Sequence, residues 1–285
     1  MIIDVSKKIL IVGLGLLGGS YARVLKRFGF FVSAITKDQS SIDYAIKENI
    51  IDEGSTELDK RIIGDADLVI FALYPHVFVE WIEQNQGLLK SGALITDVTG
   101  VKGGIVYKIQ DMLRDDVEFI SAHPMSGREV SGVENSTDRL FFGANYIVTP
   151  TKKNTPEAIQ TCMELGRLLG FSNVTTLSPE EHDEMIGFLS QLTHCIAITL
   201  MTCNDKDNME RFTGDSFRDL TRIARINDLM WSELFIANKS ALLDQMNLFI
   251  NKFNELKEML EKEDVDAMRE MMRHSTQRRA LFDKK

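Results

Sequence analysis

The residues that most constrain the fold of this chain lie at its beginning, where an apolar run meets a glycine-rich turn. Residues 8–12 read KILIV, Gly13-x-Gly15-x-x-Gly18 follows, and a helical pattern covers about 15–28. In a βαβ unit one glycine makes the tight turn, one lets backbone approach a pyrophosphate, and one packs helix on strand. This order predicts a dinucleotide site that includes Gly13, Gly15, Leu16, Leu17 and Gly18. The alternative is a glycine turn of purely structural purpose.

Residues 1–177 alternate short apolar runs with helical patterns, which is typical of a parallel sheet with helices on both faces. We expect strands at 8–12, 31–35, 68–72, 93–97, 117–121, 145–149 and 173–177. We expect helices near 15–28, 40–48, 77–89, 102–113 and 155–170. The first domain is therefore predicted to be a Rossmann-type, doubly wound α/β domain.

The pattern changes at Ser178-Pro-Glu-Glu181, which has the N-cap serine, the first-turn proline and the third-position glutamate of a helix start. No strand pattern follows, so residues 178–285 are predicted to form an all-helical second domain. In it an apolar heptad seam predicts a helix of about thirty residues. Its members are Leu242, Met246, Phe249, Phe253, Leu256 and Leu260. The seam either packs within the domain or, as we favour, forms a homodimer contact.

Composition narrows the classes of partner and compartment. The net charge of -9 argues against a nucleic-acid partner, which usually meets a basic face. No apolar run in the sequence suggests a membrane span or a secretion signal. The three cysteines, Cys162, Cys195 and Cys203, form no CxxC pair and are interpreted as small buried hydrophobic residues. We therefore expect a cytoplasmic protein.

Candidate chemistry gathers where predicted strands end. His123 follows the run 117–122, Thr99 follows the strand at 93–97, and Leu73 and Tyr74 follow the strand at 68–72. The carboxyl ends of parallel strands share one edge, so these residues are expected beside the glycine loop. A loop histidine can also be solvated and idle, and that alternative stays open.

The helical domain offers a second group of polar residues. Ser190 and His194 lie four apart, on one predicted helix face, and His182 lies three turns earlier on a more polar face. Asp219 is surrounded by Arg218, Arg222 and Arg225, which is either a solvated ion-pair face or a carboxylate-binding site. No spacing in the sequence suggests a metal site.

Several segments in order resemble the prephenate/arogenate dehydrogenase family of tyrosine biosynthesis. They read GLGLLGGS, TDVTGVKG, HPMSGREVSGVENS, LFFGANYIVTP, PEEHDEMIGFLSQLTH and SFRDLTRIARINDLMWSELFIANK. The resemblance spans nearly the whole chain. It implies a Rossmann-type N-domain, a helical dimerising C-domain, and an NAD(P)-dependent oxidative decarboxylation of prephenate to 4-hydroxyphenylpyruvate. Arogenate dehydrogenase is the near alternative, and a catalytically inactive nucleotide-binding regulator is the alternative from another class.

The resemblance also implies roles for individual residues. His123 matches the catalytic histidine that accepts the proton of the substrate ring hydroxyl. Arg222 matches the substrate-carboxylate arginine, with Asp219 as its neighbour, and Ser190 and His194 match residues lining the substrate pocket. Glu129 matches a gating acidic residue.

The sequence departs from the family pattern at three places. Gly100 stands where relatives carry a serine that steadies the histidine, so either Thr99 substitutes or the histidine is held otherwise. Arg128 stands where relatives carry Thr or Ser, which favours prephenate over the amino-bearing arogenate. Thr36 and Lys37 stand where NAD-specific sites carry Asp or Glu, which favours NADP over NAD, although Asp38 could rotate toward the ribose.

Overall fold

The structure is a computed structural model that describes residues 4–128 and 130–283. Its contacts group the chain into two compact units, residues 1–238 and residues 239–285. Each unit is described by itself. The predicted domain boundary at 177/178 falls in the short connection between the last strand and the next helix, and it stays a prediction.

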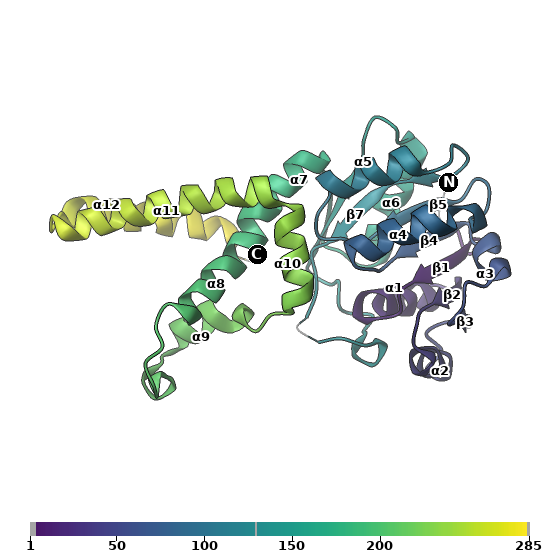
Figure 1. Ribbon diagram of the computed structural model, residues 1–285, viewed down its shortest axis with the longest axis horizontal. Coiled ribbons are helices and arrows are strands. Elements are labelled where there is room, and N and C mark those ends of the chain that lie inside the picture. Colours follow the sequence, from purple (N-terminus) through teal and green to yellow (C-terminus); the bar gives the residue numbers. More distant parts are fainter. Residues whose placement is uncertain (1–3, 129, 284–285) are drawn as a thin grey trace. The chain divides into compact units, whose positions relative to one another are not determined.

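The first unit is built on a six-stranded parallel sheet with the order β3-β2-β1-β4-β5-β6 (Figure 1). The strands are β1 (Lys8–Val12), β2 (Phe31–Ile35), β3 (Glu53–Ser55), β4 (Leu68–Phe71), β5 (Leu94–Asp97) and β6 (Glu118–Phe119). Because all six are parallel, β1, β4 and β5 end side by side at one edge.

Helices cover both faces of this sheet, as the doubly wound prediction requires. Alternate residues of β1 point to opposite sides: Ile9 and Ile11 belong to one apolar core, and Leu10 and Val12 are packed in the other. The first core is completed by α1 (Leu16–Arg27), α2 (Gln39–Lys47) and α6 (Pro156–Leu168). The second is completed by α3 (Lys60–Asp65), α4 (Pro75–Asn85) and α5 (Gly103–Met112). The predicted fold class is confirmed.

The prediction of a single parallel sheet is wrong for the last strands. The chain leaves the large sheet after β6, and β7 (Ser121–Pro124) pairs antiparallel with β8 (Asn145–Thr149), which pairs with β9 (Asn173–Thr176). One continuous apolar run thus supplies two strands in different sheets. The sequence does not predict the short elements β3 and α3, because a three-residue strand with a central glycine and a six-residue helix leave little periodicity.

The helical part of the first unit begins as predicted. Ser178 accepts a hydrogen bond from the Glu181 backbone N–H, and the Glu181 side chain accepts one from the Ser178 backbone, forming a capping box. The helices that follow are α7 (Pro179–Ile186), a π-helical turn (Gly187–Leu192), α8 (Thr193–Thr202), α9 (Asp215–Thr221) and α10 (Asp228–Ala237). No strand occurs after β9 in the described part of the chain.

The run from α7 through the π-helical turn to α8 is one helix of 24 residues, Pro179–Thr202. It is long and apolar enough to cross a membrane by length and composition, which the sequence prediction did not allow for. The same helix carries the buried residues His182, Asp183 and Gln191. These buried polar residues pack inside the protein, whereas 28% of the most apolar 18-residue window of the helix is buried.

The second unit is a helical hairpin of α11 (Lys239–Glu261) and α12 (Val265–Arg279). The expected helix of about thirty residues is wrong in length, because α11 has 23 residues. Glu263 adopts a left-handed conformation with φ 53°, and Asp264 caps α12 by accepting a hydrogen bond from the Ala267 N–H. The turn ends one helix and starts the next.

Candidate active site

The glycine loop at the end of β1 has the geometry that a dinucleotide pyrophosphate needs. Gly13 has φ +96°, and a Cβ there would lie 2.4 Å from the Ala72 carbonyl oxygen. A Cβ on Gly18 would lie 2.0 Å from the Gly13 carbonyl oxygen, so this glycine permits close packing of α1 on the strand. A Cβ on Gly15 would meet nothing within 4 Å. Gly15 therefore faces open space at the start of α1, where backbone N–H groups bind an anion.

The end of β4 lies next to this loop. The Leu73 side chain would be 2.9 Å from a Cβ on Gly13, and exposed Tyr74 precedes α4. At the first turn of α4, Glu233 of α10 accepts hydrogen bonds from the His76 backbone N–H at 2.8 Å and is paired with His76 Nδ1 at 2.8 Å. Leu73 therefore lies beside the glycine loop, as expected, and Tyr74 follows it at the start of α4.

The end of β2 carries the residues predicted to select the dinucleotide. Thr36 is half-buried and Lys37 is exposed. The Asp38 carboxylate caps α2 and accepts hydrogen bonds from the backbone N–H and the hydroxyl of both Ser40 and Ser41. Asp38 is therefore committed to the helix start rather than directed to position 36.

The end of β5 is held by a buried ion pair. Lys102 is fully buried, and its ammonium donates to Asp97 Oδ2 at 3.0 Å, to Thr99 Oγ1 at 3.3 Å and to the Ala122 carbonyl at 2.7 Å. Asp97 Oδ1 accepts from the Ser121 hydroxyl at 2.5 Å and from the Ala122 N–H at 3.2 Å. This network fixes β7 against the end of β5.

His123 lies at the centre of the site, although not in the predicted position past the end of a strand. It is the third residue of β7 and pairs with Ile147 of β8, because the chain changes sheet at Ile120. The loop after β5 reaches it: a Cβ on Gly100 would lie 3.8 Å from the His123 Cε1 and Nε2 atoms. The prediction that the 97–102 segment and His123 converge is therefore supported by these distances.

The partner of His123 in the structure is a residue to which sequence reasoning gave no role. His123 Nδ1 lies 2.9 Å from His182 Nε2, and His182 Nδ1 lies 2.8 Å from Asp183 Oδ1. Asp183 also accepts the backbone N–H of Lys102 at 2.8 Å and of Gly103 at 2.7 Å, at the start of α5. The sequence indicates only that His182 lies on a polar helix face, because its partner is 59 positions away.

Burial keeps both imidazoles neutral. It lowers the pKa of His123 well below the ordinary value of 6.5, and positive charge on His182 or Lys102 would lower it further. Burial also lowers the pKa of His182, although the hydrogen bond to Asp183 opposes that effect. A neutral His123 can accept a proton, which is what a general base needs.

Ser190 lies in the π-helical turn and His194 in the first turn of α8. The His194 Nδ1 group donates to the Ser190 backbone carbonyl at 2.9 Å, so that carbonyl contacts the ring. The His194 ring lies against Trp231 of α10, with ring centroids 3.7 Å apart. Nearby, Asn238 donates to the Asp183 carbonyl at 2.8 Å and to Gln191 Oε1 at 2.7 Å, which ties α10 to the helix that carries His182.

The remaining predicted residues lie on exposed segments. Asp219 is exposed on α9, and Arg222 is exposed on the 3-10 turn Arg222–Ala224, which packs against α8. Arg128 is exposed in the loop after β7, and Glu129 lies outside the described residues. Cys162 is buried as predicted, whereas Cys203 is exposed, so the interpretation of all three cysteines as buried is wrong.

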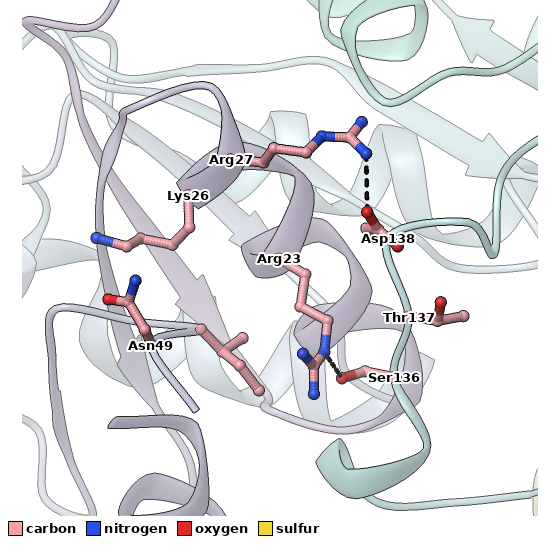
Figure 2. A pocket seen from close by; sticks show the side chains of 8 residues that line it. Arg23, Lys26, Arg27, Asn49, Ser136, Thr137 and Asp138 are labelled. Carbon is pink, nitrogen blue, oxygen red and sulfur yellow. Dashed lines mark hydrogen bonds and ion pairs between the residues drawn. The ribbon is translucent and has the colours of Figure 1, made fainter. Parts of the chain in front are cut away.

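A surface hollow of about 460 Å³ lies apart from His123, along α1 (Figure 2). Its cations have protein partners: Arg23 donates to Ser136 Oγ, Arg27 pairs with Asp138 at 2.8 Å, and Lys26 pairs with Asp52. The hollow therefore marks where the segment after β7 is fastened to α1.

Two family models together match most of the chain. The family model for the prephenate dehydrogenase nucleotide-binding domain matches residues 21–172, and that for the prephenate dehydrogenase dimerization domain matches residues 178–274. The prephenate dehydrogenase of Bacillus subtilis is 30% identical over 269 residues, covering 91% of this chain and 72% of that protein. The cyclohexadienyl dehydrogenase of Zymomonas mobilis is 27% identical, with 96% of each chain covered.

A solved structure is similar over almost its full length. It is the prephenate dehydrogenase from A. aeolicus in complex with hydroxyphenyl propionate and NAD+, with a TM-score of 0.90, 31% identity, and coverage of 97% of this chain and 98% of that chain. Fold and site together define a dinucleotide-binding oxidoreductase. Within that class, the chain belongs to the prephenate dehydrogenase family.

Proposed function

We propose that this protein catalyses the oxidative decarboxylation of prephenate to 4-hydroxyphenylpyruvate in tyrosine biosynthesis. The observation that carries the proposal is the neutral His123, held beside Gly100 at the edge of the sheet that also carries the glycine loop. Relatives that are named prephenate dehydrogenases support the choice of substrate.

His123 performs the proton step of this reaction. Its Nε2 accepts a hydrogen bond and then the proton from the hydroxyl of the substrate ring. The dinucleotide, when bound at Gly13, Gly15 and Gly18, supplies the acceptor for the hydride that leaves the same ring carbon. The bond to the ring carboxylate then breaks, its electrons make the ring aromatic, carbon dioxide leaves, and the ring oxygen regains a proton.

Residues of the helical segment are assigned to the substrate. Arg222 binds a substrate carboxylate with Asp219 beside it, and Ser190 and His194 line the pocket. Guanidinium geometry suits carboxylates, and His194 packs against Trp231 and lies on the same helix as His182. Glu129 is assigned a gating role by resemblance.

The cofactor is NAD or NADP, and we propose that NADP is accepted. Thr36 and Lys37 offer a hydroxyl and an ammonium where a carboxylate would repel a 2′-phosphate, and Asp38 is occupied by α2. The NAD+ in the A. aeolicus complex supports use of NAD as well. Initial rates with each dinucleotide check this, and a strong preference for NAD would contradict it.

The charge of Arg128 favours prephenate over arogenate, which carries an additional amino group. We expect Arg128→Thr to lower the ratio of kcat/KM for prephenate to that for arogenate, because a cation is removed from the loop after β7. An unchanged ratio would contradict this role.

The protein is proposed to act as a homodimer in the cytoplasm. The matched dimerization domain and the exposed apolar residues of α11 support the dimer. The unpaired cysteines fit a reducing compartment.

The test of the function is reduced-cofactor absorbance with prephenate and with arogenate, each against NAD and NADP. Turnover of prephenate is expected. Turnover of arogenate alone would favour the near alternative, and no turnover in any combination would favour a nucleotide-binding regulator.

A further inference from the structure

Three side chains, His123 among them, form a continuous series of hydrogen bonds. Asp183 contacts His182, which is fully buried, and His182 contacts His123 through its other ring nitrogen. The links are 2.8 Å and 2.9 Å long. All three residues belong to the same compact unit.

The hydrogen bonds of Asp183 determine where the protons of this chain lie. Both carboxylate oxygens already accept backbone N–H groups, from Lys102 and Gly103, so Asp183 acts as an acceptor. His182 must then donate from Nδ1, which in a neutral ring leaves Nε2 as an acceptor. His123 must donate from Nδ1 to that atom, and its own Nε2 keeps the lone pair.

From this geometry we propose that His182 and Asp183 are positioning residues that hold His123 in the tautomer whose Nε2 accepts the substrate proton. The inference rests on the proposed function and adds the source of the base's orientation. Without the hydrogen bond to His182, neutral His123 could carry its proton on Nε2, and that tautomer cannot accept a proton there.

Thr99, the one residue that the sequence suggested as a substitute for the family serine, does not take this role. The Thr99 hydroxyl contacts the Asp97 carboxylate and the Val101 carbonyl. Gly100 has no side chain, and the nearest His123 atoms to a Cβ there would be Cε1 and Nε2 rather than Nδ1. His182 is thus the answer to how the histidine is held without the family serine.

The hydrogen bonds that link Asp183, His182 and His123 also compensate charge during the reaction. When Nε2 of His123 takes up a proton, the ring becomes cationic at a site that already contains the buried Lys102 ammonium. Asp183 supplies the opposing carboxylate through His182, in the same way that a buried aspartate stabilises the imidazolium of a catalytic triad.

Two substitutions at one position separate this role from packing. In His182→Gln the amide oxygen can reach His123 and accept its Nδ1–H, whereas in His182→Asn the shorter amide keeps a donor for Asp183 and leaves His123 without a partner. We expect kcat to fall by about 100-fold in His182→Asn and by less than about 10-fold in His182→Gln. The KM for the dinucleotide should stay unchanged in both.

The kcat of each variant is compared with its thermal midpoint Tm and with the activity of the wild-type protein. Equal losses of kcat in the two variants, or a loss that follows the thermal midpoint Tm, would overturn the positioning role. Inactivity of the wild-type protein with every substrate would instead overturn the proposed function, so the two failures are distinguishable.

A second readout needs no substrate. Nitrogen-15 NMR of the free protein is expected to show His123 with a protonated Nδ1 and an unprotonated Nε2. In His182→Asn the two tautomers should mix. A wild-type His123 with its proton on Nε2 would overturn the inference whatever the activity.

Discussion

His123 acts as a base only while its ring is neutral, and its surroundings keep the ring neutral to lower pH than usual. Burial, His182 and Lys102 all disfavour the imidazolium, so its pKa lies well below 6.5. We therefore expect the acid-side midpoint of the kcat/KM profile to lie below pH 6.5. An acid midpoint at or above that pH would contradict this, and rates measured across a buffer series decide it.

The lowered pKa of His123 also makes the stability of the fold depend on pH. The unfolded chain binds a proton on this histidine below pH 6.5, and the native protein excludes it. The free energy of unfolding should therefore decrease as the pH falls from 6.5 toward the lower pKa of the folded state.

Lys102 is a residue whose removal should cost stability rather than only activity. In Lys102→Met the Asp97 carboxylate stays buried without its cation, and breaking a buried pair costs about 3–5 kcal/mol. Lys153→Met is the matched control, since Lys153 pairs with Asp111 at the surface and should change stability by less than about 1 kcal/mol. Urea unfolding measures both, and similar losses would refute the distinction.

At this scale the sequence predicted the local geometry of the glycine turn but not the long-range partner of His123. The spacing of Gly13, Gly15 and Gly18 within six residues predicts a tight turn, an open backbone and a close helix–strand contact, and each glycine has the corresponding surroundings. The contact between His123 and His182 depends on how α7 packs against β7 and α5. No local pattern encodes that packing.

Among the elements, the helix Pro179–Thr202 differs most from its sequence pattern. Its π-helical turn adds a residue to the helical period, and His194 then contacts the Ser190 carbonyl. The sequence placed both residues on one helix, four positions apart, but did not indicate the π-helical turn, a feature that is frequent at functional sites.

The strand elements show a similar limit. The run 117–122 predicts one strand by composition, yet it supplies β6 to one sheet and β7 to another. The change of sheet is what turns His123 toward His182, and it depends on pairing with β8 rather than on apolar character.

The junction between α10 and the helix carrying His182 depends on Asn238. In Asn238→Ala two buried acceptors, the Asp183 carbonyl and Gln191 Oε1, lose their donor, which costs about 1–3 kcal/mol. Asn254→Ala, at an exposed position of α11, should stay within about 0.5 kcal/mol of wild type. Thermal unfolding compares them, and equal stability would exclude a structural role for Asn238.

For the whole molecule, the seam on α11 predicts how copies associate. Phe249 and Phe253 stack on each other and are 38% and 61% exposed in a single copy. Replacing Phe253 with Glu should shift the protein toward monomer, because a charge would be buried at the contact. Asn251→Glu, on the opposite side of α11, is the control and should remain dimeric. Analytical ultracentrifugation measures both, and a dimeric Phe253→Glu would refute the seam as the contact.

Asp183 carries a consequence for how this sequence can change over time. The Asp183 carboxylate accepts backbone N–H groups at the start of α5 and also orients His182, which contacts His123. A substitution at position 183 that alters His123 therefore also disturbs the start of α5. Gly100 makes no such structural contacts, and there is room for a side chain there beside the His123 ring. Evolutionary adjustment of this base is therefore easier from the β5 loop than from α7.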